Sequence, residues 1–146
     1  MIVSDLLNTK GTEVISIAEN ALLATAVGIM SASRIGALVV EDNRGALIGL
    51  VSEREVVAAM SRWGTSAGAR RVTEVMVSPP ATVAASDTVD HVMAVMTNRR
   101  ARHVPVLRDG RVAGILSIGD VLKSRLDEKT LENAVLRDMA RWPHAA

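Results

Sequence analysis

At 146 residues, with 49% hydrophobic and 23% charged residues, the chain has the composition of one soluble globular domain or of two small units that share a core. The absence of cysteine excludes disulfides and thiolate chemistry, and a net charge of +1 with only two aromatic residues argues against nucleic acid as a partner. The N-terminus lacks the features of a secretory signal, and the most apolar segment, 21–30, is too short to span a membrane. We therefore expect a cytoplasmic protein that binds neither nucleic acid nor membranes.

In the first half of the chain, the apolar pattern predicts a strand, a helix, a β-hairpin and a second helix. Their expected ranges, in that order, are 14–17, 21–33, 37–40 with 47–51, and 53–62. Asn20 is the expected N-cap of the first helix, because its side chain can accept a hydrogen bond from the first turn. The stretch 64–71 is rich in glycine, serine and alanine, and we interpret it as a linker.

The second half predicts the same order of elements, followed by a longer helix. The expected ranges are 81–83 for the strand, 88–98 for the helix, 104–107 with 112–116 for the hairpin, and 121–141 for the last helix. Ser86 or Asp87 is the expected N-cap of the first of these helices, and Pro143 is expected to end the last one. Asp109-Gly110 joins the hairpin strands, since glycine accepts the positive φ of a tight turn.

The two halves align with each other as an internal repeat. Ser16-Ile17 aligns with Thr82-Val83, and Glu55 aligns with Asp120 once a one-residue difference in the hairpin turn is allowed for. A single half is too small to cover its own sheet. We therefore expect an α+β fold of two β-α-β-β-α repeats, packed sheet to sheet with pseudo-twofold symmetry, plus a C-terminal helix. The expected boundaries are 1–71 for the first repeat with its linker, 72–126 for the second repeat, and 127–146 for the helical extension.

Each repeat ends its hairpin with a serine that is followed, three positions later, by an acidic residue. These pairs are Ser52 with Glu55 and Ser117 with Asp120. One interpretation is a helix capping box, in which hydroxyl and carboxylate satisfy backbone N–H groups at the start of a helix. The other is a ligand site, in which a hydroxyl and a carboxylate are presented side by side. The local sequence alone leaves both open.

The duplicated pattern, an apolar strand, a turn, and then Gly-apolar-apolar-Ser with an acidic residue three positions on, resembles a tandem pair of cystathionine-β-synthase (CBS) domains, the Bateman module. Val72-Thr73-Glu74-Val75-Met76 and Arg102-His103-Val104-Pro105-Val106 also match the family pattern. The resemblance covers nearly the whole chain and is closest to the stand-alone bacterial CBS-pair proteins.

The resemblance implies that adenosine nucleotides such as AMP, ATP or NAD(H) bind in two clefts between the repeats. In the second site, Asp120 matches the position that binds the ribose hydroxyls, with Ser117 beside it. Arg102 and His103 match positions that contact phosphate, and Thr82 matches a hydroxyl position on the first strand. Val104, Pro105 and Ile118 are the expected adenine slot.

The first site departs from the family pattern. Glu55 stands where aspartate is expected, and its extra methylene shifts the carboxylate, so we expect weaker binding there. Arg54 can pair with Glu55 or reach a phosphate. The full set expected in this site is Ser16, Ile35, Gly36, Ala37, Ser52, Arg54 and Glu55.

The sequence offers no metal-ligand spacing, no P-loop and no recognisable catalytic constellation, so we expect neither a metal nor an enzyme. The C-terminal helix carries an apolar stripe of Leu131, Val135, Met139 and Trp142, from which we expect a homodimer. Two functions remain: a nucleotide sensor that signals to an unknown protein partner, and a ligand-independent dimerisation or scaffold module.

Overall fold

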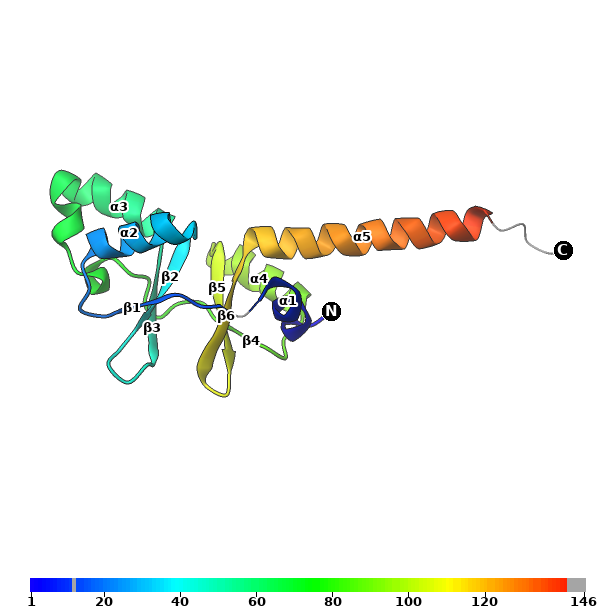
Figure 1. Cartoon of the computed structure of the whole chain (residues 1–146), viewed down its shortest axis with the longest axis horizontal. Coiled ribbons are helices and arrows are strands. Elements are labelled where there is room, and N and C mark those ends of the chain that lie inside the picture. Colours follow the sequence, from blue (N-terminus) through cyan, green and yellow to red (C-terminus); the bar gives the residue numbers. More distant parts are fainter. Residues whose placement is uncertain (12, 142–146) are drawn as a thin grey trace.

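The computed structural model describes residues 1–11 and 13–141 and contains two three-stranded sheets of identical topology (Figure 1). In each sheet the first strand pairs parallel with the second, which pairs antiparallel with the third. The strands of the first sheet are β1 (Ser16–Ala18), β2 (Ala37–Glu41) and β3 (Leu47–Ser52), and those of the second are β4 (Val83–Ala84), β5 (His103–Arg108) and β6 (Arg111–Ser117). The predicted α+β duplication is confirmed.

Five α-helices and two short 3₁₀ helices accompany the sheets in the described part of the chain. The α-helices are α1 (Val3–Lys10), α2 (Leu23–Ser33), α3 (Glu53–Trp63), α4 (Val89–Arg99) and α5 (Ile118–Arg141), and the 3₁₀ helices are η1 (Gly64–Ala69) and η2 (Val72–Glu74). The segment interpreted as a linker is therefore partly helical. Ala67 within it is fully buried, so η1 packs into the first repeat rather than spanning open solvent.

The two predicted N-caps are wrong, in each case because another contact holds the backbone. Leu22, not Asn20, precedes α2: it forms an isolated bridge with Arg71 and stays extended, so the helix starts later. Thr88 caps α4 by accepting a hydrogen bond from the N–H of His91 at 3.1 Å. Asp87 instead accepts one from the N–H of Ala84 at 2.7 Å, which holds the turn before the helix.

The sheets face each other, and the helices cover their outer faces (Figure 1). Between the sheets, Ala37, Val39 and Leu50 of the first repeat are buried together with partly buried side chains that include Val112 and Ile115 of the second. Removing such apolar surface from water contributes about 1.5–3 kcal/mol per fully buried large side chain. This contact fixes the relative position of the two repeats.

The segment that precedes each repeat packs against the other one. Leu7 of α1 lies in the core of the second repeat, and Met76, just after η2, packs against the core of the first. Each lies over a glycine of the last strand: a Cβ on Gly114 would be 2.6 Å from Cδ2 of Leu7, and a Cβ on Gly49 would collide with Met76. A larger residue at either position would displace Leu7 or Met76, so glycine permits this close approach. The crossing anchors α1 firmly beside the second repeat.

Helix α5 continues far beyond the body of the molecule (Figure 1). Its first turns pack through Val121, which is 2% exposed, whereas Leu131, Val135 and Met139 are at least half exposed. The helix begins at Ile118, three residues earlier than predicted. Two predicted features, Trp142 at the end of the apolar stripe and Pro143 as the helix stop, lie outside the described residues.

Candidate functional site

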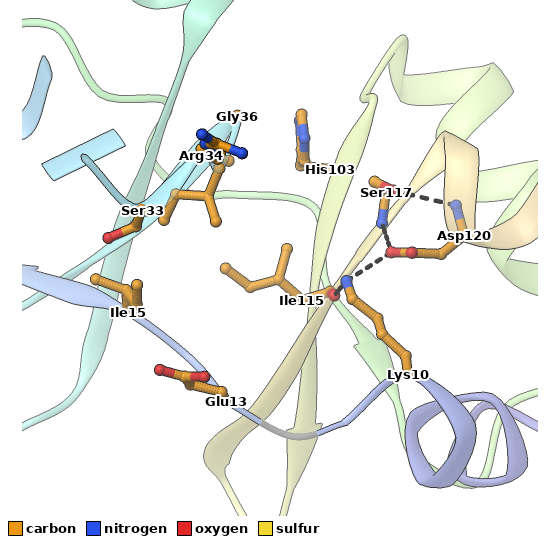
Figure 2. A pocket seen from close by; sticks show the side chains of 12 residues that line it. Lys10, Glu13, Ile15, Ser33, Arg34, Gly36, His103, Ile115, Ser117 and Asp120 are labelled. Atoms are coloured by element: carbon orange, nitrogen blue, oxygen red, sulfur yellow. Dashed lines mark hydrogen bonds and ion pairs between the residues drawn. The ribbon is translucent and has the colours of Figure 1, made fainter. Parts of the chain in front are cut away.

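The two repeats enclose a cavity of about 550 Å³ (Figure 2). One wall comes from the first repeat, where α2 ends and β2 begins, and the opposite wall comes from β5, β6 and the first turn of α5. Lys10, at the end of α1, and Glu13 and Ile15, just before β1, close the space between these walls. The lining residues are Lys10, Glu13, Ile15, Ser33, Arg34, Ile35, Gly36, Ala37, His103, Ile115, Ser117 and Asp120.

Asp120 and Ser117 form a reciprocal capping box on this wall. The N–H of Ser117 donates to Oδ2 of Asp120 at 2.8 Å, and the N–H of Asp120 donates to Oγ of Ser117 at 3.1 Å. Among the described residues, none donates a hydrogen bond to Oδ1 of Asp120. The capping interpretation is therefore correct, and it also holds the carboxylate at a fixed position on the cavity wall.

Lys10, the last residue of α1, places its ammonium group directly on this carboxylate. Its Nζ lies 2.5 Å from Oδ2 of Asp120 and also donates to the carbonyl oxygen of Ile115 (Figure 2). The Lys10 side chain is 35% exposed and that of Asp120 is 23% exposed, so the pair is partly shielded from solvent. A cation and a carboxylate are thus presented to the same cavity.

The environment lowers the pKa of two cavity residues. Partial burial of Asp120 opposes its charged form, but the hydrogen bonds from Lys10 and from Ser117 outweigh this effect and hold the carboxyl pKa below its ordinary value. Burial lowers the pKa of His103, and the nearby carboxylate of Glu53 only partly offsets this effect. At neutral pH, Asp120 is therefore ionised and His103 is neutral.

His103 reaches from β5 towards the first repeat, where it meets Gly36. A Cβ on Gly36 would be 3.1 Å from Nε2 of His103 and 3.6 Å from Oε1 of Glu53. The glycine therefore leaves room for the imidazole at the rim of the cavity, and any larger residue there would narrow the space.

The structure places three of the residues expected in the first site beside Asp120. Ile35, Gly36 and Ala37 line the cavity that contains Asp120, whereas Glu55 does not. The reason is the packing of the two sheets, which brings the start of β2 opposite the end of β6. The cavity that contains Asp120 therefore takes its walls from both repeats.

Several other candidates do not line the cavity that contains Asp120. Val104 and Pro105 are buried, and Val104 belongs to the core of the second repeat. The exposed residues among the rest are Ser16, Arg54, Arg102 and Ile118, and Thr82, just before β4, is partly buried. Of the second-site candidates, His103, Ser117 and Asp120 come together here.

In the first repeat, the equivalent serine and carboxylate bind to each other. Oε1 of Glu55 accepts hydrogen bonds from both the N–H and the Oγ of Ser52, at 3.1 and 2.8 Å. Arg54 does not pair with Glu55: its Nη1 donates to the carbonyl oxygen of Arg100 at 2.9 Å. Glu55 is thus engaged in capping, and Arg54 ties α3 to the end of α4.

Sequence reasoning missed half of the cavity lining: Lys10, Glu13, Ile15, Ser33, Arg34 and Ile115. No local pattern in the sequence marks these residues. Among the described residues, no group of three or more histidines or carboxylates is arranged to hold a metal ion. No helix in the described ranges is long and apolar enough to cross a membrane.

Comparisons with known proteins agree with this architecture. The family model described as "CBS domain" matches residues 3–62 and 72–127. Among curated proteins, the mitochondrial CBS domain-containing protein CBSX3 of Arabidopsis thaliana is 34% identical over 107 residues, which are 70% of this chain and 52% of that protein. The chain therefore spans about half the length of this relative.

Two solved structures illustrate the similarity in three dimensions. The CBS-domain containing protein ATU1752 from Agrobacterium tumefaciens is 38% identical, with a TM-score of 0.83 over 86% of this chain and 99% of that chain. The CBS domain pair of protein MJ0100, solved in complex with 5′-methylthioadenosine and S-adenosyl-L-methionine, is 26% identical, with a TM-score of 0.76 over 89% of this chain and 98% of that chain.

Proposed function

Because the chain belongs to the CBS domain family and carries two CBS repeats, we propose that it is a non-catalytic regulatory module that binds an adenosine nucleotide of the AMP, ATP or NAD(H) class. The ligand binds in the cavity that contains Asp120, and a protein partner detects the resulting change in how the repeats pack. A ligand can drive such a change only if it binds the two packing states with different affinity.

The observation that carries this proposal is the carboxylate of Asp120, which is fixed on the cavity wall between the two repeats. A ribose diol requires an acceptor for two hydroxyl hydrogens, and a carboxylate meets this requirement with its two oxygens. Oδ1 accepts from no described donor, and Oδ2 becomes available when Lys10 moves. The hydroxyl of Ser117 accepts from a backbone N–H and retains its own hydrogen for donation.

The rest of the cavity fits the other parts of an adenosine nucleotide. Ile15, Ile35 and Ile115 supply apolar walls for the base, and the volume of about 550 Å³ lies in the range of small-molecule sites. Arg34 and Lys10 supply positive charge for a phosphate. The complex of the related MJ0100 pair with two adenosine-containing ligands supports this ligand class.

The proposal includes a homodimer formed through the exposed apolar face of α5. Met139 lies five helical turns after Val121 and therefore on the same side of the helix that packs against the body. The buried face thus continues, unpaired within the described chain, as an apolar stripe that a second copy would cover. Sedimentation equilibrium tests this: Val135→Glu with Met139→Glu should give a monomer, whereas Arg137→Ser, two residues from each and therefore on the opposite face, should leave the dimer intact. A wild-type monomer would contradict it.

A ligand-independent scaffold is the second candidate function. The observation that favours it is that both acidic residues, Glu55 and Asp120, cap helices. In that case, substitution of Asp120 would change stability alone.

Calorimetric titration of the purified protein with AMP, ATP, NAD⁺, NADH and S-adenosylmethionine separates the two candidates. Saturable binding of one ligand is expected, weakened about tenfold to 100-fold in Asp120→Asn because the amide loses one charged acceptor oxygen. Glu55→Gln is the matched control and should retain wild-type affinity. If the folded protein bound none of these ligands, the result would contradict the sensor function and favour the scaffold function.

A further inference from the structure

Lys10 occupies the carboxylate that the proposed ligand needs. Its Nζ contacts Oδ2 of Asp120 at 2.5 Å and the carbonyl oxygen of Ile115. Lys10 does not belong to a loose N-terminal tail, since Val3, Leu6 and Leu7 anchor α1 in the core of the second repeat. The ammonium group is therefore delivered to this carboxylate by a fixed helix.

A ribose that donates both hydroxyl hydrogens to Asp120 competes with Lys10 for Oδ2. The displaced ammonium group then remains in the partly enclosed cavity, because the backbone of Lys10 is fixed in α1. A cation in such a place is unfavourable unless an anion accompanies it. A ligand with a phosphate next to the ribose supplies that anion, whereas a neutral nucleoside supplies none.

We infer that Lys10 is a specificity-determining residue, which pairs with Asp120 in the unliganded protein and moves to the ligand phosphate, so that the site selects phosphorylated adenosine over neutral nucleosides. This inference rests on the proposed function. It assigns Lys10 a role different from that of Arg34, which lines the same cavity without contacting Asp120. Loss of Arg34 removes a cation for the phosphate, but loss of Lys10 also frees the carboxylate for the ribose.

The two residues therefore predict different signs of change for a neutral ligand. In Lys10→Met, adenosine should bind several-fold more tightly and AMP several-fold more weakly, so that the ratio of the two affinities falls at least tenfold. In Arg34→Gln, AMP should weaken while adenosine stays unchanged. Lys10→Arg keeps the charge and should keep the preference for AMP. Lys129→Met, at an exposed lysine nine residues beyond Asp120 on α5, is the matched control and should change neither affinity.

The experiment is calorimetric titration of adenosine and AMP into the wild-type protein and these variants, with Lys10→Gln as a second variant in case Lys10→Met does not fold. A ratio that stays at the wild-type value in both neutral variants, while both ligands still bind, overturns the inference and leaves the proposed function intact. A wild-type protein that binds adenosine as tightly as AMP also overturns it. A wild-type protein that binds no adenosine ligand overturns the proposed function together with this inference.

Discussion

The two repeats share a backbone pattern but use their acidic residues differently. In the second repeat, Oδ2 of Asp120 accepts from the N–H of Ser117 and from Lys10, and Ser117 keeps its hydroxyl hydrogen. In the first, a single oxygen of Glu55 accepts from both the N–H and the hydroxyl of Ser52. The additional methylene of glutamate lets the Glu55 carboxylate reach the hydroxyl of Ser52 and accept its hydrogen bond. Capping is thus common to both repeats, whereas a carboxylate that contacts a lysine, and a serine hydroxyl that does not donate to that carboxylate, belong to the second.

Substitution of the glycines that lie under Leu7 and Met76 should destabilise the two repeats equally. This is the largest effect that we expect. Gly49→Val and Gly114→Val should each lower the free energy of unfolding by about 1–3 kcal/mol, because the new side chain displaces Met76 or Leu7 from a packed core. Urea denaturation measures this. If one variant were as stable as the wild type, the crossing contact would not be equivalent in the two halves.

Exchanging the types of the two acidic residues should affect ligand affinity differently in the two repeats. Asp120→Glu is expected to weaken nucleotide binding about tenfold, or about 1.4 kcal/mol, because the longer side chain can satisfy Ser117 as Glu55 satisfies Ser52. Glu55→Asp should change affinity less than about twofold. Calorimetry on both variants checks the contrast, and equal losses would contradict a functional difference between the sites.

Gly36 tests whether the cavity draws on both repeats. Gly36→Val should weaken binding about fivefold, or about 1 kcal/mol, because its side chain would meet His103 and narrow the cavity. The control is Gly28→Ala on α2, where an added Cβ meets nothing within 4 Å. Retained affinity in Gly36→Val would mean that the start of β2 does not contribute to the site.

The smallest expected effect is a pH dependence of stability from His103. Its pKa is lowered in the folded protein, so the unfolded chain binds the proton more tightly than the fold does. Stability should therefore fall as pH drops through the ordinary histidine value of 6.5 towards the folded pKa. Thermal denaturation across this range should show a weaker slope in His103→Gln. The pKa of Asp120 is also lowered in the folded protein, but its ionised form is the charged one. Its contribution to stability is therefore present at neutral pH and is lost only below about pH 3.8.

The features that the sequence predicts correctly are local or duplicated. The hairpins follow from apolar runs flanking short turns, such as the Asp109–Gly110 turn, where both residues have positive φ. The capping boxes follow from residues three positions apart. Each pattern alone is weak, but its occurrence twice in the same order predicts the fold. The match of the family model to both repeats confirms this prediction.

The features that the sequence does not reveal depend on long-range contacts. Lys10 and Asp120 are separated by 110 positions, and only the crossing of α1 to the second repeat brings them together. The sequence also does not show that Ile35 lies opposite Asp120 in one cavity, because only the packing of the two sheets brings these residues of different repeats together. The missed N-cap at Leu22 also reflects a tertiary contact, the bridge to Arg71.

The number of ligand molecules bound per chain at saturation tests the central claim most directly. The claim is that one functional cavity, containing Asp120 and walled by both repeats, serves the whole chain, while the Glu55 counterpart only caps a helix. Calorimetric titration with the ligand that binds should give one molecule per chain. Two equivalent molecules per chain would show that Glu55 supports a site as good as that of Asp120, and would contradict this account.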